Sequence, residues 1–163
     1  MSEFPYDRPK SNKEIGREAW LQRQQYYWRN KTTLKFNTVV GEIYEVDFGE
    51  NIGSEFSGRH LALCLSDTTS YNDRVLVIPL TTKYEMYNIQ DVIETTSYVE
   101  NKPIKAGVVI NEARYISKMR IFKTSIILKE SEEDKRIPVG KIKLTQKQLT
   151  KFRSFVVWEN MYL

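Results

Sequence analysis

The chain has 163 residues, a length that fits one domain, and 40% of them are apolar, which is enough for a hydrophobic core. The longest apolar runs, 61–65 and 75–80, are far shorter than a membrane-spanning helix, and the N-terminus has no apolar stretch for a signal peptide. One cysteine excludes an internal disulfide framework, and one cysteine with one histidine argues against a zinc site. We therefore expect a cytoplasmic protein without a metal or other cofactor.

The charge is unevenly distributed along the chain. Residues 1–36 hold eight Lys/Arg and four Asp/Glu, whereas 37–163 hold 17 of each, so the whole excess of +4 lies at the N-terminus. A basic, aromatic-rich segment of this kind indicates an acidic partner, either nucleic acid or an acidic protein, or else a solvated helix. We expect 1–36 to form a helical arm and 37–163 to form the main domain.

The N-terminal arm carries the signals of a helix start. Ser11 and Glu14 have the spacing of a capping box, and the stretch up to Arg29 lacks proline and has apolar residues near helical spacing. The sequence predicts a helix over about 12–29.

Short strands are predicted through the middle of the chain. Tyr44, Val46 and Phe48 alternate with charged residues, which is typical of a half-buried strand. Pro79 inside one apolar run suggests a sheet edge or a bulge. Further strands are expected, and the set as a whole predicts a bent sheet or partial barrel: 61–65, 74–80, 90–96, 107–110 and 136–143.

Two helices are expected after the central strands. Thr145 and Gln148 form a second capping box, with Leu144 and Leu149 placed to form a hydrophobic staple. The following apolar positions 149, 152, 155 and 156 lie on one helical face, which should cover one side of the sheet. A shorter helix is expected over 117–123.

Few residues suggest chemistry without reference to a family. The chain has no glycine-rich nucleotide-binding loop, and a Ser-His-Asp triad would depend on His60 alone, which serves equally well as an ordinary strand residue. Cys64 lies within an apolar run and is expected to be an inert core residue. The loop 49–59 is longer than a usual hairpin connection and is the best candidate for a site, although it also reads as a plain surface loop.

Three sequence blocks are similar to the MazF/PemK toxin family. The first reads GEIYEVDF at 41–48, followed by GSE at 53–55 and GR at 58–59, and it resembles the family pattern G-[ED]-[IV]-Y-x-[VA]-D-[LF] then G-S-E-x-x-G-x-R-P. The second block, 75–81, ends in a threonine like the matching family strand. The third, 109–120, resembles the family stretch L-x-E-Q-x-R-T-I-D-K-x-R.

The resemblance implies a fold and an activity. It implies a mostly β fold, an SH3-like partial barrel of the MazF/PemK/CcdB kind, with a C-terminal helix and here an N-terminal helical extension. It also implies a homodimeric endoribonuclease of a toxin–antitoxin system, which cuts single-stranded RNA at short motifs without a metal and leaves a 2′,3′-cyclic phosphate and a 5′-hydroxyl. The implied partners are RNA, a cognate antitoxin and, together with the antitoxin, DNA.

The same resemblance assigns residues to the site. The family's catalytic arginine and threonine fall on Arg59 and Thr81 when the loop before Arg59 is taken as one residue shorter than in the family. Arginine stays protonated in proteins, so we expect Arg59 to clamp the transition state and Glu55 to be the base. RNA contacts are expected from residues of the first and third blocks, with the phenylalanine either stacking on a base or plugging the core: Ser54, Phe56, His60, Glu112 and Arg114.

Several positions depart from the family pattern. His60 stands where the pattern has proline, Glu112 where it has glutamine and Ser117 where it has aspartate. The alternative functions are a gyrase inhibitor on the same fold and a nucleic-acid-binding regulator in which 1–36 does the binding.

Overall fold

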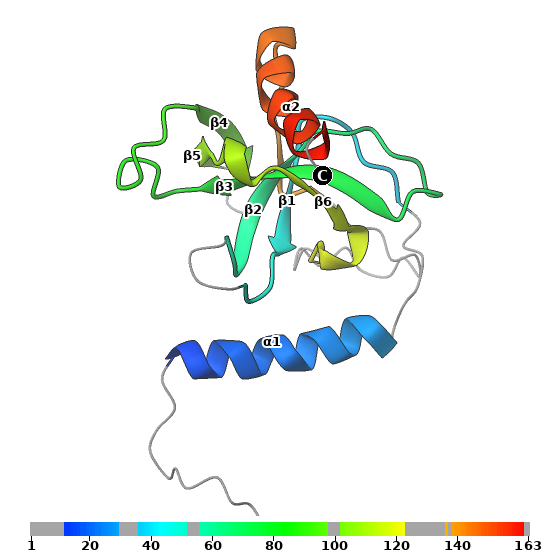
Figure 1. The fold of residues 1–163 in the computed structure, drawn as a ribbon. Coiled ribbons are helices and arrows are strands. Elements are labelled where there is room, and N and C mark those ends of the chain that lie inside the picture. Colours follow the sequence, from blue (N-terminus) through cyan, green and yellow to red (C-terminus); the bar gives the residue numbers. More distant parts are fainter. Residues whose placement is uncertain are drawn as a thin grey trace, which may run out of the picture.

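A strongly bent antiparallel sheet forms the body of the protein (Figure 1). The structure is a computed structural model, and it describes residues 12–29, 36–51, 56–97, 102–122, 136 and 138–161. Within these residues one seven-stranded open sheet has the order β4-β5-β3-β2-β1-β7, with β6 paired to β3 beside β5. The strands are β1 (Glu42–Asp47), β2 (Arg59–Cys64), β3 (Arg74–Thr81), β4 (Val92–Ser97), β5 (Lys102–Val108), β6 (Arg114–Ser117) and β7 (Gly140–Lys141). The predicted mostly β partial barrel with a helix at each end is confirmed.

The alternation of side chains along the strands produces two separate cores. Leu63, Ile78 and Leu80 belong to a first cluster, which also includes residues of β4, β5 and the C-terminal helix. Ala62 and Val77 belong to a second cluster on the other side of the same strands. Successive residues of β2 and β3 therefore alternate between the two sides, as extended strands require.

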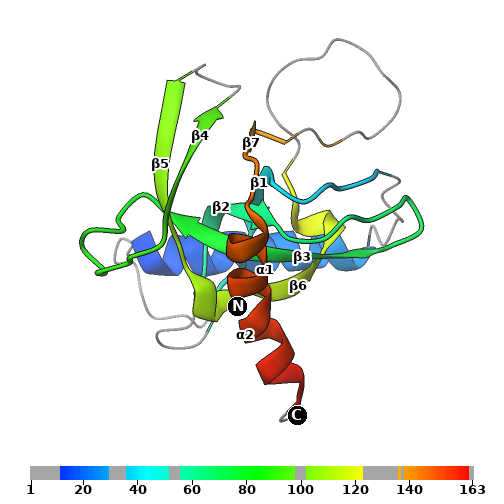
Figure 2. The same cartoon turned by 90° about the horizontal axis from the view of Figure 1, so that it is seen from above.

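The C-terminal helix covers the first of these cores. This helix, α2 (Gln146–Met161), begins at the predicted capping box: the backbone N–H of Gln148 donates to Thr145 Oγ1 at 3.2 Å, and Thr145 N–H donates to Gln148 Oε1 at 3.0 Å. Phe152 is 1% exposed within the first cluster and Leu149 packs against it, so this part of the predicted apolar face packs on the sheet, while the side chains of 155 and 156 lie outside the described ones. Figure 2 shows α2 crossing above β2 and β3.

Pro79 pairs with β2 on one side of β3, and on the other side it lies where the pairing is interrupted, which is the local edge that this proline predicts. Pro79 pairs with Ala62 of β2. On the other side of β3, the Pro79 carbonyl accepts a hydrogen bond from Val109 N–H at 3.0 Å. The N side of Pro79 faces the gap between β5 and β6, where the one-turn helix η1 (Ile110–Glu112) interrupts the pairing. The missing N–H of proline therefore removes no ladder hydrogen bond there.

Some other element bounds also differ from the prediction. β5 begins at Lys102 and not at 107, β6 was not predicted, and β7 is shorter than the predicted strand. The predicted short helix is the single 3-10 turn η2 (Lys118–Arg120). No described helix is both long and apolar enough to cross a membrane.

The predicted N-terminal helix is present and lies against one end of the barrel. α1 (Asn12–Arg29) runs below the end of β1 in Figure 1. Arg23 Nε donates to Asp47 Oδ2 at 2.6 Å, and the Tyr27 hydroxyl donates to the same oxygen at 3.0 Å. Trp20 is 8% exposed and packs on Gly49, where any Cβ would lie 2.7 Å from the indole ring. The Ser11 part of the first capping box lies outside the described residues.

Candidate functional site

The register of β2 and β3 decides which residue of the 49–59 region faces Thr81. Ala62 pairs with Pro79 and Leu63 with Ile78, so continuing this register by two residues places His60 directly opposite Thr81. Directly opposed side chains share one side of a sheet and have Cβ atoms about 5 Å apart. His60 and Thr81 therefore share the side that carries Ala62 and Val77.

Arg59 projects from the opposite side of β2 and does not join Thr81. Its Nε donates to Glu45 Oε1 at 2.5 Å and its Nη2 to Glu45 Oε2 at 2.7 Å, a two-point ion pair on the surface. The guanidinium also lies 4.1 Å from the centre of the Phe122 ring. The hydrogen bond to Glu45 raises the pKa of Arg59, so this group stays charged. The expected meeting of Arg59 and Thr81 is thus corrected: one residue along a strand reverses the side.

The family pattern itself contained this answer. Read without a gap from Gly53, the pattern G-S-E-x-x-G-x-R-P places its arginine on His60 and its proline on Leu61. The shorter loop instead matches an arginine with an arginine, at Arg59. The strand register favours the ungapped reading, in which a histidine occupies the position of the family's catalytic arginine.

His60 sits between aromatic rings and backbone carbonyls. Its ring centre lies 4.3 Å from that of Phe56 and 6.4 Å from that of Phe48. Burial is the main cause that lowers its pKa below the usual 6.5; the charge of Lys83 lowers it further, and the carbonyls of Ser57 and Leu80 act in the opposite direction. The imidazole is therefore mostly neutral at pH 7. Nε2 is 3.0 Å from the Ser57 carbonyl oxygen, which only accepts, so Nε2 carries the proton of the neutral ring.

Thr81 is held as a hydrogen-bond donor. The backbone N–H of Lys83 donates to Thr81 Oγ1 at 3.2 Å, so one lone pair of this oxygen is occupied and its own O–H can donate elsewhere. Lys83 is exposed and close enough to His60 to affect its pKa. Sequence reasoning missed Lys83, although it stands two residues after the family's threonine.

Phe56 and Arg114 both contact Phe48, close to His60. The rings of Phe48 and Phe56 pack edge to face with centres 5.2 Å apart. The Arg114 guanidinium lies 4.7 Å from the Phe48 ring centre, and its Nη2 donates to the Phe56 carbonyl at 3.2 Å. Phe56 is half-buried and packs on the second core, which is the plug that the sequence left open as an alternative to a stacking platform.

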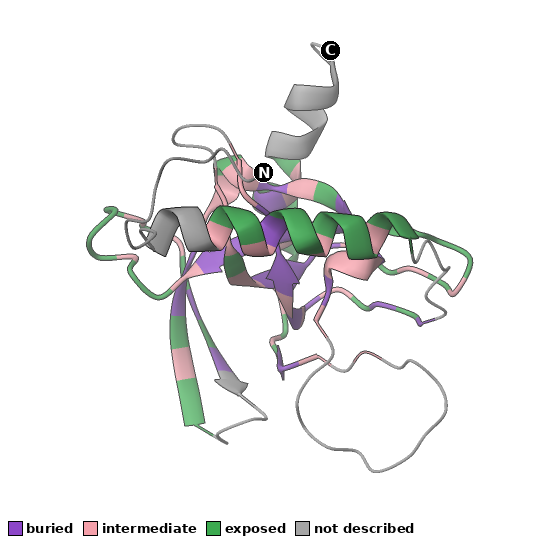
Figure 3. Ribbon diagram, turned by 90° about the horizontal axis from the view of Figure 1, so that it is seen from below, coloured by how far each residue is buried: buried purple, intermediate pink, exposed green. Residues whose placement is uncertain are grey.

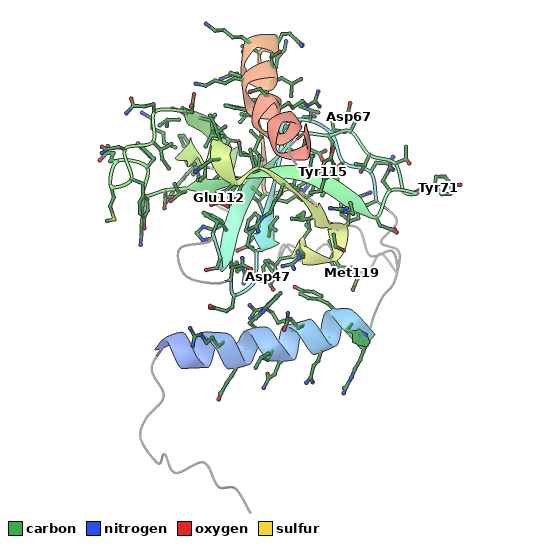
Figure 4. All side chains as sticks on the ribbon, in the orientation of Figure 1. Asp47, Asp67, Tyr71, Glu112, Tyr115 and Met119 are labelled. Atoms are coloured by element: carbon green, nitrogen blue, oxygen red, sulfur yellow. The ribbon has the colours of Figure 1, made fainter. Side chains whose placement is uncertain are left out.

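The remaining predicted residues are less closely placed. Glu112 is half-buried in η1, which runs beside β3 between the residues that pair with β5 and with β6 (labelled in Figure 4). Ser54 and Glu55 lie outside the described residues. Cys64 is buried as expected, and burial raises the pKa of its thiol. In the described parts of the chain, no three His, Cys, Asp or Glu side chains gather as metal ligands would.

The fold and this arrangement are those of a small toxin built on a partial β barrel. The family model of the PemK-like, MazF-like toxins of type II toxin–antitoxin systems matches residues 40–149. The chain belongs to this family, and membership implies an antitoxin as its partner. A comparison with curated proteins gives no match.

Proposed function

We propose that the protein is a toxin that cleaves single-stranded RNA without a metal, leaving a 2′,3′-cyclic phosphate and a 5′-hydroxyl. The observation that carries the proposal is the register of β2 with β3, whose continuation from Ala62–Pro79 by two residues puts His60 and Thr81 on the same side of neighbouring strands. An imidazole whose pKa is lowered by burial lies there near a hydroxyl that can donate. These are the two kinds of group that cleavage by the RNA's own 2′-hydroxyl requires.

In the proposed cleavage reaction, three side chains have separate roles: His60, Thr81 and Lys83. Nδ1 of His60 takes the proton of the 2′-hydroxyl as that oxygen attacks phosphorus, and the bond from phosphorus to the 5′-oxygen breaks. The Thr81 hydroxyl donates to a non-bridging phosphate oxygen, whose charge grows in the transition state. The Lys83 ammonium adds positive charge nearby, and the departing 5′-oxygen takes a proton from water. In the proposal Arg59 serves to hold Glu45 rather than the phosphate.

The two residues first assigned to catalysis remain testable alternatives. Arg59 as the clamp would require its side chain to reach the Thr81 side of β2, and Glu55 as the base lies outside the described residues. Breaking the two-point contact with Glu45 would be the first step for Arg59. A cleavage assay distinguishes these assignments because His60 and Arg59 are adjacent in sequence but project to opposite sides.

The test is cleavage of a mixed single-stranded RNA in EDTA, with the 5′ ends mapped and the terminal phosphates identified. His60→Gln and Thr81→Val should each reduce the rate at least 100-fold, in line with the loss of an acid–base group or a transition-state donor. Thr82→Val, at the exposed neighbouring position, is the matched control and should cleave as the wild type does. Arg59→Ala should keep most of the activity.

Two results would contradict this proposal. Intact RNA after long incubation with folded wild-type protein would remove the nuclease and leave a binding protein such as a gyrase inhibitor. Full activity in His60→Gln together with none in Arg59→Ala would return the catalytic role to Arg59.

The partners and the organisation of the chain complete the proposal. We take a homodimer as the active form, the antitoxin as the inhibitor and the cytoplasm as the compartment. We also retain the division into an N-terminal arm, 1–36, and a toxin domain, 37–163, although α1 contacts the body through Asp47 and Gly49. Sedimentation of the purified protein tests the dimer.

A further inference from the structure

An arginine-lined pocket opens between the segment after β1 and the strand β6, which are not paired with each other. It has a volume of about 280 Å³, and one wall is formed by Phe48 and Asn51 after β1. The opposite wall is the outer edge of β6, a strand that pairs only with β3 among the described strands. The barrel closes only beyond the pocket, where Val46 forms a bridge with Ile121.

The lining of this pocket is strongly basic. Arg74, Arg114 and Arg120 contribute to it, and no carboxylate is among the described residues that line it. Arg120 donates to the carbonyl of Asp47 at 3.0 Å, which uses one of its five N–H donors. Arg74 is exposed and lies 5.6 Å from the ring centre of Tyr115. The charge thus gathers around an opening that is accessible to solvent.

An aromatic ring stands at the mouth of the pocket. Tyr115 is 47% exposed, although it lies on a strand, and one face of its ring meets the Arg74 guanidinium. Figure 4 shows Tyr115 on β6, in the same half of the barrel as Met119. Guanidinium groups bind phosphate oxygens and aromatic rings stack on bases, so the two chemistries of a nucleotide occur side by side.

The pocket is continuous with the proposed catalytic residues. Phe48 and Arg114 line it, and these two residues contact each other and the ring or carbonyl of Phe56, which packs on His60. We propose that this pocket binds a nucleotide of the single-stranded RNA that neighbours the cleaved bond, with its phosphate on Arg74 and Arg120 and its base on Tyr115. The proposal rests on the proposed RNA substrate and adds a subsite that helps to select and orient it.

Binding is measured with a fully 2′-O-methylated single-stranded RNA, which lacks the attacking hydroxyl, so that affinity is separated from cleavage. Fluorescence anisotropy over a range of salt concentrations gives the dissociation constant and its salt slope. Arg74→Ala and Tyr115→Ala are the informative variants because both side chains are exposed and neither donates a hydrogen bond to the fold among the described contacts. Lys105→Ala on β5 and Tyr71→Ala, at a side chain that is 93% exposed, are the matched controls.

The subsite predicts a specific pattern of losses. Arg74→Ala should weaken binding and lower the salt slope by about 0.7, the value for one phosphate contact on a single strand. Tyr115→Ala should weaken binding about fivefold to tenfold with an unchanged slope, as the loss of one stacked base would. The two controls should bind as the wild type does.

The outcomes separate this proposal from the function on which it rests. If Arg74→Ala and Tyr115→Ala both bind RNA as tightly as the wild type does, the subsite proposal is overturned, whether or not unmodified RNA is cleaved. Wild-type binding that depends on both residues, with no cleavage of unmodified RNA, would support the subsite while the nuclease proposal fails.

Discussion

The attachment of α1 to the barrel predicts a measurable loss of stability when Arg23 is removed. Arg23 and Tyr27 both donate to the carboxylate of Asp47, which is 0% exposed, while the Arg23 side chain is 38% exposed. A hydrogen bond to a charged group contributes about 1.5–3 kcal/mol, and partial exposure reduces the share of Arg23. We expect Arg23→Ala to lower the free energy of unfolding by about 2 kcal/mol.

Equilibrium urea unfolding measures this loss, and a double-mutant cycle isolates the contact. Asp47→Asn removes the charge but keeps an oxygen that can accept from Tyr27, so the coupling between Arg23→Ala and Asp47→Asn should be about 1–2 kcal/mol. A loss of 2 kcal/mol corresponds to a fall in Tm of about 4–8 °C for a chain of this size. Arg17→Ala, on the exposed surface of the same helix, is the control and should stay within about 0.5 kcal/mol of the wild type.

Hydrogen exchange locates the change. If α1 is held by this contact, Arg23→Ala should speed amide exchange in α1 while the amides of β2 and β3 remain protected. Equal stability of Arg23→Ala and Arg17→Ala, with no coupling to Asp47→Asn, would refute the reasoning and return α1 to the status of a loosely attached arm.

Four further predictions concern His60, Lys118 and two glycines. The rate of RNA cleavage should rise with pH, and the midpoint of this rise should lie below pH 6.5 because burial lowers the pKa of His60. In His60→Gln this rise should be absent from the pH–rate profile. Because of the same shift, the folded state binds fewer protons than the unfolded state. The contribution of His60 to stability is therefore complete above pH 6.5 and is lost as the pH falls through the folded-state pKa. The stability of His60→Gln should consequently depend less on pH in the acid range. Lys118 is 1% exposed and donates to the carbonyls of Phe36 at 2.7 Å and Thr69 at 2.9 Å, so Lys118→Met should cost about 2–4 kcal/mol in urea unfolding, and a loss below 1 kcal/mol would mean that water replaces the ammonium. Gly41→Ala should lower the free energy of unfolding by about 3 kcal/mol or more, since φ is +95° and the new Cβ would lie 2.2 Å from the Ile142 carbonyl oxygen. Gly16→Ala inside α1 should instead raise the Tm slightly. The reverse order of the two variants in thermal unfolding would contradict this reasoning.

The helices were predictable from the sequence because their signals are local. A cap residue and the residue three positions later decide where a helix begins, and at Thr145 and Gln148 both reciprocal hydrogen bonds are present. The alternation in β1 likewise predicted a strand, but the strand is not half-buried as expected, because Ile43 and Asp47 on its other side are buried as well. Each of these features depends on neighbours within a few residues.

The missed strands depend on residues far away in the sequence. The first half of β5 is rich in lysine and contains Pro103, so no apolar pattern marks it, and it exists because it pairs with β4 over six residue pairs. β6 is only four residues long and is stabilised by its pairing with β3. Tertiary pairing overrides local propensity in both cases.

The candidate site was predicted in part for a related reason. Thr81 and the loop stay predictions as site positions, and which side of β2 a residue occupies changes with a shift of one position. A gap placed to match arginine with arginine moved Arg59 into the place of His60. The register with β3 was needed to decide between them, and the sequence alone does not contain it.

The position of α1 changes the meaning of the basic N-terminus. Arg23 is one of the cations that make 1–36 positive, yet its charge is paired with the buried Asp47 inside the fold. Leu21 and Trp28, by contrast, are 57% and 64% exposed. Figure 3 shows α1 as a largely exposed helix when the molecule is seen from below. One side of the helix therefore fixes the end of β1 beside the proposed site, and the other side remains accessible. Disrupting the Asp47 contact should consequently alter RNA cleavage through the loop that follows β1, even though no residue of α1 takes part in the chemistry.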